Sequence, residues 1–313
     1  LNAKATVMAA ESVFEDKGRR LPIMLSITIA DAAGRMLTGQ SIEAFVATVI
    51  HFHPLSIGIN CSFGPAQLRP FIKQLRKAAP CYVSAYPNAG LPNALGEYDE
   101  SPESMAAYMR TLVSEGLVDI VGGCCGTTPE HIRMLSHECQ AVAHKHNTTP
   151  KVAWLAGIDA FTPMEGTFIN VGERCNVAGS RKFLRLISEK QYDEALTIAR
   201  KQVRDGAMLL DINMDDAMLD AKAEMTHFLN LMASDPEVSR VPWMVDSSKF
   251  DVIEAALKCI QGKAVVNSIS LKEGEEEFLR RARIISSYGA AMVIMGFDEK
   301  GQATTFNRKI EVC

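Results

Sequence analysis

Short apolar runs alternate along the chain with segments whose apolar residues recur at helical spacing. In the first half the expected strands are almost continuously apolar, which is typical of a parallel sheet covered by helices. The pattern predicts strands at 21–29, 55–60, 81–86 and 118–123, and helices at 3–14, 41–52, 66–79, 102–114 and 130–144.

The same alternation restarts in the second half of the chain. It predicts strands at 167–171, 208–212, 243–245, 264–266 and 290–295, and helices at 183–187, 192–204, 221–232, 252–260 and 275–287. Gly206, Gly262 and Gly289 follow three of these helices, where a left-handed cap costs least. Residues 145–166 are polar or without period, which indicates an interdomain linker. We therefore expect domains at 1–147 and 167–313, joined by a linker at 148–166.

Composition narrows the class of protein. Of the 313 residues, 47% are hydrophobic and 22% are charged, as in soluble globular proteins. A net charge of −4 gives no reason to expect nucleic acid or a membrane surface as partner, and no apolar run is long enough to span a bilayer. Eight cysteines without a secretory signal fit reduced thiols in the cytoplasm. Because the chain begins at Leu1 inside a helical pattern, we expect an interior piece of a longer protein.

Three cysteines occupy equivalent places in the first half. Cys124 and Cys125 follow the apolar run 118–121 and precede a helix, and Cys61 follows the run 55–59 in the same way. Three thiolates on such turns can hold zinc and leave its fourth position open for a soft ligand such as a substrate thiol. The alternative is that they are small buried residues, since the spacing is not that of a zinc finger.

Polar residues cluster where the strands of the second half end. They are Asn176, Asp211, Asn213, Asp246 and Asn267. In a βα barrel the turns after the strands form the catalytic face. The alternative is that Asp, Asn and Ser at these places only cap the following helices.

The motifs of both halves resemble those of the cobalamin-dependent methionine synthase family. Segments 58–61 and 122–129 are similar to the zinc-ligand segments of its homocysteine-binding barrel, and 86–92 and 96–98 are similar to the intervening loop. The resemblance extends over essentially the whole chain, with the motifs in the family's order. The segments similar to the folate-binding barrel are 170–176, 179–181, 211–215, 246–248 and 266–270.

The resemblance implies two consecutive (β/α)8 TIM-type barrels, each only partly present in this chain. It implies Zn2+ on Cys61, Cys124 and Cys125, which binds homocysteine through its sulfur. A metal-bound thiol is deprotonated, whereas a free thiol is a poor nucleophile at neutral pH. The thiolate would take a methyl group from methylcobalamin, which 5-methyltetrahydrofolate then methylates again.

The second barrel would hold the folate by fixed polar groups. The resemblance implies that its pterin contacts come from Asn176, Gly179, Ser180, Arg181, Asp211, Asn213, Asp246 and Asn267. Arg181 is expected to meet an anionic part of the folate or to pair with a local acid. No residue is assigned a catalytic role beyond the zinc site. The family's cobalamin signature, Asp-x-His-x-x-Gly, does not occur in the sequence, so we expect cobalamin on another domain of a full-length protein.

Two other functions remain open. A zinc-dependent homocysteine S-methyltransferase with a different methyl donor would explain the three cysteines but would leave residues 167–298 without a role. A truncated binding module that captures zinc or folate without turnover belongs to a different class, and the isolated chain is expected to be inactive.

Overall fold

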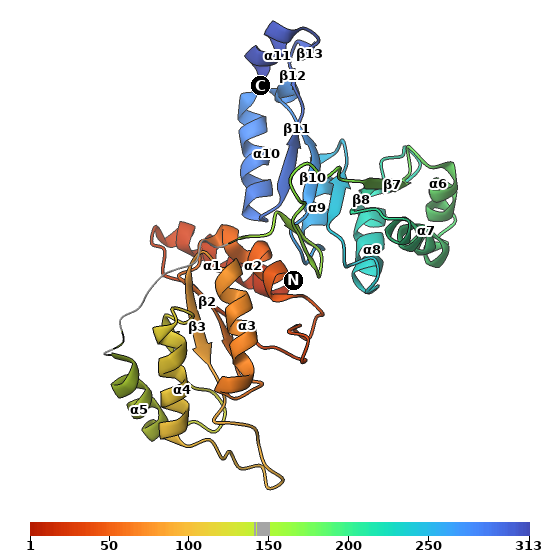
Figure 1. Cartoon of the computed structure of the whole chain (residues 1–313). Coiled ribbons are helices and arrows are strands. Elements are labelled where there is room, and N and C mark those ends of the chain that lie inside the picture. The colour runs from red at the N-terminus through yellow and green to blue at the C-terminus, as the bar shows by residue number, and fades with distance from the viewer. Residues whose placement is uncertain (141, 143–150) are drawn as a thin grey trace. The chain divides into compact units, whose positions relative to one another are not determined.

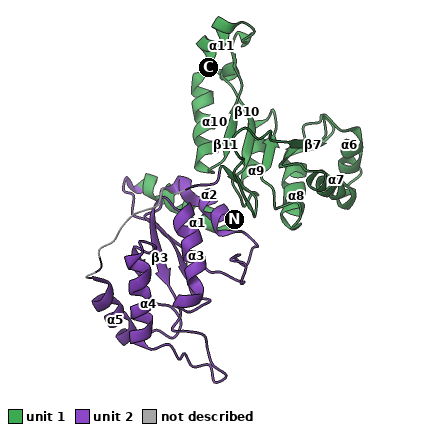
Figure 2. Cartoon of the chain, in the orientation of Figure 1, with its two compact units in different colours: residues 1–16, 154–313 green, residues 17–153 purple. Residues whose placement is uncertain are grey.

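The computed structural model describes residues 1–140, 142 and 151–313, and these form two compact units (Figure 1). One unit comprises Lys17–Ala153, and the other comprises Leu1–Asp16 together with Trp154–Cys313 (Figure 2). These boundaries differ from the expected division at 147 and 167. The last residues expected in the helix 130–144 and the first expected in the linker lie outside the described residues.

The unit Lys17–Ala153 is a parallel sheet with helices between its strands. Its sheet order is β1-β2-β3-β4, which is also the order along the chain. Each of the helices α2 to α5 packs against the next one along the chain, so the helices are arranged in the same order as the strands (Figure 1). The elements are β1 (Met24–Ile27), α2 (Ile42–Val49), a 3-10 turn (Ile50–Phe52), β2 (Ser56–Asn60), α3 (Pro65–Ala78), β3 (Tyr82–Tyr86), α4 (Pro102–Ser114), β4 (Ile120–Val121) and α5 (Pro129–Gln140).

The expected elements of this unit are confirmed, and α4 shows why local sequence defines them. The side chain of Ser101 accepts a hydrogen bond from the Ser104 amide, and Pro102 occupies the first turn, where its missing N–H costs nothing. Met105, Met109 and Leu112 are fully buried and recur at helical spacing. Strand β4 is much shorter than the expected 118–123.

The other unit contains a five-stranded parallel sheet of order β11-β10-β9-β8-β7. Its core includes the rings of Phe183 and Phe228, which meet edge to face with centroids 5.3 Å apart. The elements are α1 (Asn2–Lys17), β5 (Leu155–Ala156), β6 (Ala160–Phe161), β7 (Val171–Asn176), α6 (Arg181–Ser188), α7 (Tyr192–Arg204), β8 (Leu209–Asn213), α8 (Ala221–Ala233), β9 (Trp243–Asp246), α9 (Phe250–Leu257), β10 (Val265–Ile269), a 3-10 turn (Leu271–Glu273), α10 (Glu275–Ser287), β11 (Ala291–Ile294), β12 (Phe297–Asp298), β13 (Gly301–Gln302) and α11 (Phe306–Val312).

The first strand of this sheet corrects an expectation. The apolar run 167–171 was the expected strand, but Phe168 is 84% exposed and the ladder with β8 begins at Val171 and continues to Asn176. A bulge between Gly172 and Cys175 interrupts the alternation of buried and exposed residues. Backbone pairing with β8 therefore determines where this strand begins and ends, and the apolar character of its sequence does not determine it.

The expected linker also contains regular structure. Strands β5 and β6 form a short hairpin, and Ala156 exchanges two backbone hydrogen bonds with Lys263. The close contact between β5 and the segment at Lys263 explains why residue 262 is a glycine. Gly262 does not have the left-handed conformation expected of a helix cap, whereas Gly206 and Gly289 do. A Cβ on Gly262 would lie 1.9 Å from the Ala156 carbonyl oxygen, so the position excludes any side chain.

Helix α1, expected in the first domain, packs in the unit that carries the pterin-type motifs. The buried Lys4 ammonium donates hydrogen bonds to the carbonyl oxygens of Ile260, at 3.2 Å, and Gly262, at 3.1 Å. Burial lowers the pKa of Lys4 to about 8.

Both sheets are open within the part of the chain that the structure describes. The parallel α/β architecture is therefore confirmed, whereas closure into barrels is not shown. Among the described residues, no helix has both the length and the apolar character needed to cross a membrane.

Candidate functional site

The three cysteines singled out in the sequence lie together in the unit Lys17–Ala153. The Sγ atom of Cys125 is 3.5 Å from that of Cys61 and 3.9 Å from that of Cys124. All three sulfurs lie within 4.8 Å of one another, and no other group of metal-binding side chains was found among the described residues. Cys125 is exposed and the other two are half-buried, so a small ligand can reach the cluster.

The sheet topology explains this proximity. Cys61 follows β2, and Cys124 and Cys125 follow β4; β3 lies between these two strands, and all three run parallel. The carboxyl ends of β2, β3 and β4 therefore lie at the same edge of the sheet. Both Cys61 and Ser62 have positive φ angles, of 64° and 66°, which is unusual for residues with a side chain and marks functional sites in many proteins.

The segment after β3 holds both thiol-bearing turns in place. The Cys61 amide donates to the carbonyl of Tyr86 at 2.9 Å, and the Cys124 amide donates to that of Pro87 at 2.8 Å. The side-chain oxygen of Asn88 accepts a hydrogen bond from the Cys125 amide at 3.1 Å. Asn88 was not assigned from the sequence, because its contact depends on the order of the strands.

The environment acts differently on the individual thiols. The backbone N–H of Ser62 lowers the pKa of Cys61, because a hydrogen-bond donor stabilises the thiolate. Burial raises the pKa of Cys124. The environment thus shifts the pKa values of Cys61 and Cys124 in opposite directions, and a bound cation would favour the thiolate form of its ligands.

The spacing of the sulfurs fits zinc. A tetrahedral site with Zn–S bonds of about 2.3 Å places its sulfurs about 3.8 Å apart. The measured 3.5 and 3.9 Å lie on either side of this value. Three protein sulfurs leave one tetrahedral position for another ligand.

A second group of polar side chains lies in the other unit, at the carboxyl ends of its strands. Asn176 is in register with Asn213, Asn213 with Asp246, and Asp246 with Asn267. Four neighbouring strands therefore present a continuous polar row, which we call the Asn176–Asn267 row. The amide of Asn176 donates to the Oδ2 atoms of Asp211 and Asp246, each at 3.2 Å.

Asp211 is the most unusual member of this site. It is 2% exposed, and its Oδ1 atom has no hydrogen-bond partner among the described residues. Burial, reinforced by the charge of Asp246, raises the pKa of Asp211 to about 6. Burial also raises the pKa of Asp246. A buried acceptor without a partner is costly, and a ligand with N–H donors would satisfy it.

Gln202 on α7 fixes the bulge that positions Asn176. Its side-chain oxygen accepts from the Arg174 amide at 2.7 Å, and its amide donates to the Cys175 sulfur at 3.2 Å. Gly172 leaves room for this side chain. Gln202 was not assigned from the sequence, where it is one more residue of an amphipathic helix.

The segment between Asn176 and α6 contains Gly179 and Ser180, and Arg181 is the first residue of α6. The Gly179 amide donates to the side-chain oxygen of Asn176 at 3.1 Å. Ser180 accepts from the Phe183 amide at 3.3 Å and thereby caps α6, and Arg181 is exposed at the start of that helix. Their contact with a ligand stays a prediction.

Asp215 was quoted within a motif but not assigned a role. Its carboxylate accepts hydrogen bonds from the Ser247 hydroxyl at 2.7 Å and from the Ser248 amide and hydroxyl at 2.6 and 2.7 Å. It therefore fixes the turn that follows Asp246.

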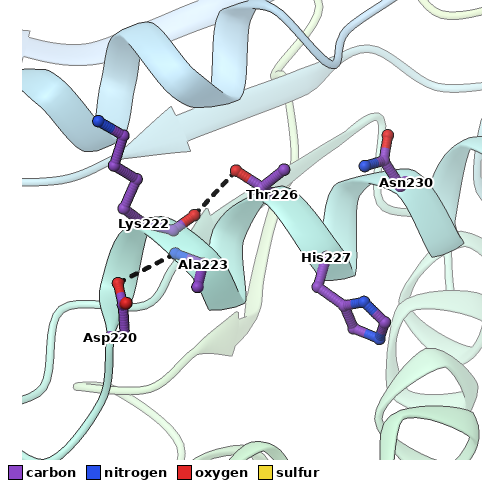
Figure 3. A pocket seen from close by; sticks show the side chains of 6 residues that line it. All are labelled: Asp220, Lys222, Ala223, Thr226, His227 and Asn230. Carbon is purple, nitrogen blue, oxygen red and sulfur yellow. Dashed lines mark hydrogen bonds between the residues drawn. The ribbon is translucent and has the colours of Figure 1, made fainter.

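A hollow on α8 carries no comparable chemistry (Figure 3). Asp220 accepts a hydrogen bond from the Ala223 amide at 3.1 Å, and Thr226 donates to the carbonyl of Lys222 at 2.8 Å (Figure 3). Both side chains thus serve the helix itself, and the His227 ring lies against that of Tyr192, with centroids 4.3 Å apart and the planes tilted by 57°. We assign no function to this hollow.

Solved structures with detectable similarity include carboxyl transferases. The carboxyl transferase domain of Rhizobium etli pyruvate carboxylase with 3-hydroxypyruvate is 14% identical, over 90% of this chain and 50% of that one, with a TM-score of 0.25. The same domain with pyruvate is 15% identical, over 96% and 53%, with a TM-score of 0.26. The complete pyruvate carboxylase from Rhizobium etli is 14% identical, over 90% of this chain and 29% of that one, with a TM-score of 0.26. The chain spans about half the length of these domains.

Family comparisons divide the chain as its motifs do. Residues 1–139 match the family described as homocysteine S-methyltransferase. Residues 172–313 match the family described as pterin binding enzyme. The first match contains the thiol cluster, and the second contains the whole Asn176–Asn267 row. The chain therefore carries a homocysteine S-methyltransferase domain and a pterin-binding domain, a pair consistent with a methionine synthase-like protein.

Proposed function

We propose that the protein transfers a methyl group from 5-methyltetrahydrofolate to homocysteine, giving methionine and tetrahydrofolate, with cobalamin as the intermediate carrier. The observation that carries this proposal is the set of three sulfurs at tetrahedral spacing within a homocysteine S-methyltransferase segment. The pterin-binding segment supplies a second substrate site on the same chain.

Cys61, Cys124 and Cys125 would hold a Zn2+ ion whose open position takes the sulfur of homocysteine. When bound, zinc would keep that sulfur deprotonated at neutral pH, which makes it a nucleophile. The protein holds the ligand turns rigidly by the backbone and Asn88 contacts that follow β3. Rigid placement reduces the entropy lost when substrate and metal come together.

The Asn176–Asn267 row would bind the pterin. A pterin edge presents N–H donors and ring acceptors side by side, so it needs acids and amides in fixed positions. Asp211 and Asp246 supply acceptors, while Asn213 and Asn267 supply both kinds of group. The unpartnered Oδ1 atom of Asp211 is where an incoming donor would gain most. Gly179, Ser180 and Arg181 would border the same ligand.

We further propose that each unit is part of a (β/α)8 barrel. The edge strands carry apolar residues that a neighbouring strand would cover: Met24 on β1 is 48% exposed and Ile294 on β11 is 61% exposed. No residue of this chain is assigned to cobalamin, for which we propose a further domain of the same protein. Its proposed location is the cytoplasm.

The alternative functions explain less of the structure. A zinc-dependent homocysteine S-methyltransferase with another donor leaves the register-matched polar row and the orphaned Asp211 oxygen without a role. A binding module without turnover would use both sites, and it differs from the proposed enzyme only because no methyl group is transferred.

Separate titrations of the two substrates test the proposal. The chain should bind one zinc ion, and homocysteine should bind only the zinc-loaded form, because its sulfur is a ligand of the metal. Removal of zinc with a chelator should leave 5-methyltetrahydrofolate affinity unchanged, since the pterin residues belong to the other domain. Homocysteine binding that survives complete zinc removal would contradict the assignment. Formation of methionine after addition of the cobalamin domain would distinguish an enzyme from a binding module.

A further inference from the structure

Strand β7 contains one residue more than the part of β8 with which it pairs. Gly172 is in register with Leu210, and Cys175 is in register with Ile212, so β7 advances from 172 to 175 while β8 advances only from 210 to 212. Such a bulge shifts every later residue of the strand by one position. Because side chains alternate between the two faces of a sheet, this shift determines which residues of β7 face the pterin-type site.

The bulge brings Asn176 to the face that carries the acids. Asn176 is in register with Asn213. Its amide donates to the Oδ2 atoms of Asp211 and Asp246, each at 3.2 Å. In an unbroken ladder Cys175 would stand opposite Asn213 instead. The Asn176–Asn267 row would then lose the amide that bridges its two carboxylates.

An unbroken ladder would also place a charge in the core. Arg174 would then stand opposite Ile212, whose side chain is fully buried in the core of this unit. In the observed register Cys175 takes that place and is itself fully buried, whereas Arg174 is exposed. Burial of an unpaired guanidinium is costly, so the side chains of β7 favour the bulge. The backbone of the bulge still needs a partner, because the extra residue falls outside the ladder.

Gln202 of α7 supplies that partner. Its side-chain oxygen accepts from the Arg174 amide at 2.7 Å, and its amide donates to the Cys175 sulfur at 3.2 Å. Gln202 is only 8% exposed, so water cannot readily replace it. Both partners precede Asn176 directly in β7. The effect of Gln202 on the site therefore passes through the backbone of this strand.

Gly172 provides the space that Gln202 occupies. A Cβ on Gly172 would lie 2.8 Å from Gln202 Oε1 and 3.1 Å from the Cβ of Ala207. A side chain at position 172 would therefore displace the oxygen that accepts from the bulge. The glycine and the glutamine are thus two parts of one arrangement, one on β7 and the other on α7.

We propose that Gln202 is a positioning residue of the pterin site, which fixes the register of β7 so that Asn176 reaches Asp211 and Asp246. The inference rests on the proposed function, in which the Asn176–Asn267 row binds the pterin. Without Gln202 the Arg174 amide loses its acceptor, and the end of β7 is no longer held in one register. Asn176 then occupies its bonding position for a smaller fraction of the time, and the affinity for the pterin falls by that fraction.

Gln202→Met tests this role, because it removes both polar contacts at a similar side-chain length. In the 313-residue chain it should weaken 5-methyltetrahydrofolate binding about tenfold, the effect of about one hydrogen bond, as measured by isothermal titration calorimetry. Gln191→Met is the matched control, since the exposed Gln191 precedes α7 and its side chain forms no capping hydrogen bond. This control should bind folate as the unmodified chain does. An equal loss in both variants would overturn the role of Gln202.

A double variant distinguishes positioning from a general loss of stability. Asn176→Ala removes the group that Gln202 positions, so it should weaken binding by itself, and Gln202→Met should cause no further loss in that background. Leu196→Ala truncates another buried residue of α7. It should lower the unfolding temperature but leave the folate affinity of the folded chain unchanged. Additive losses in the double variant, or an equal loss of affinity in Leu196→Ala, would contradict the inference.

A measurement without ligand separates this inference from the proposed function. Burial raises the pKa of Asp211, and the hydrogen bond from Asn176 opposes this rise. Gln202→Met should therefore raise the pKa of Asp211 further, as followed by carbon-13 NMR titration of its carboxyl group. If the unmodified chain does not bind 5-methyltetrahydrofolate, the proposed function fails. The titration then decides alone: a raised pKa supports the positioning of Asn176, and an unchanged pKa overturns it.

A further variant covers the case in which Gln202→Met does not fold. Gly172→Ala keeps the glutamine but displaces its oxygen, so it should show the same loss of folate affinity and the same rise in the pKa of Asp211. Circular dichroism checks the folding of each variant. Normal folate affinity in folded Gly172→Ala and Gln202→Met, with the unmodified chain binding folate, would overturn the inference and leave the proposed function intact.

Discussion

The Sγ atoms of Cys61 and Cys125 lie 3.5 Å apart, although 64 residues separate them in the chain. The intervening residues form α3, β3, α4 and β4, and the order β2-β3-β4 places the two thiol turns at one edge of the sheet. Parallel strands joined by helices always end on the same side, so recurring cysteines after such strands are brought together.

Replacing Cys124 by alanine should abolish stoichiometric zinc binding. Only two sulfurs would remain, and a structural or catalytic zinc site needs at least three protein ligands. Zinc content after dialysis, measured by atomic absorption, gives the result. Cys139→Ala is the control, because Cys139 is a half-buried residue of α5 outside the cluster. Equal zinc content in the Cys124 and Cys139 variants would refute the site.

Asp246→Ala and Asn267→Ala should each weaken 5-methyltetrahydrofolate binding by roughly 10- to 100-fold, the cost of about 1–3 kcal/mol for a lost hydrogen bond to a buried partner. Isothermal titration calorimetry measures this. Homocysteine binding should not change, because the thiol cluster belongs to the other unit. The exposed Asp251 of α9 is a matched acid, and Asp251→Ala should bind folate normally. Normal folate affinity in both site variants would remove the Asn176–Asn267 row from the binding site.

Stability should depend on pH through Asp211. Its pKa rises from 3.8 to about 6 on folding, so between these values the folded chain binds more protons than the unfolded chain. The free energy of unfolding therefore falls as the pH rises through this window, and above pH 6 the ionised, buried carboxylate is a net cost. Asp211→Asn should remove this fall and should stabilise the chain at pH 7 more than at pH 4. Urea unfolding at both pH values measures the difference, and an equal effect at each would contradict the prediction.

Gly58→Ala should destabilise the sheet of the unit Lys17–Ala153 by about 1–3 kcal/mol, the usual cost of overpacking a core. An added Cβ would lie 1.8 Å from the Ser84 Oγ atom and 2.6 Å from the Ser84 carbonyl oxygen on β3. Ser84→Ala in the same background removes the first contact but not the second, so it should recover only part of the loss. Thermal unfolding of the single and double variants measures this. An unchanged midpoint in Gly58→Ala would show that β2 and β3 are farther apart than described.

The sequence predicted those features that depend on neighbouring residues along the chain. Helices α4, α7 and α10 begin and end at the predicted residues, because apolar spacing defines a helix locally, and in α4 the Ser101 cap adds to it. The strand-end positions of the cysteines and of the polar residues at the ends of β8, β9 and β10 were also evident, since these strands end where their apolar runs end. The hairpin of β5 and β6 and the true bounds of β7 were not, because both are defined by hydrogen bonds to distant segments.

Contacts between distant segments decided the rest. Gly262 is a glycine because β5 passes 1.9 Å from where its Cβ would be, and no local pattern contains that information. The register that aligns Asn176, Asn213 and Asp246, and the contact of Asn88 with Cys125, likewise arise only when the strands are ordered in a sheet. The sequence by itself determined which residues end most of the strands, with β7 as the exception. Tertiary structure determined which of them meet, because strand order and register are set by long-range pairing and packing that local periodicity does not encode.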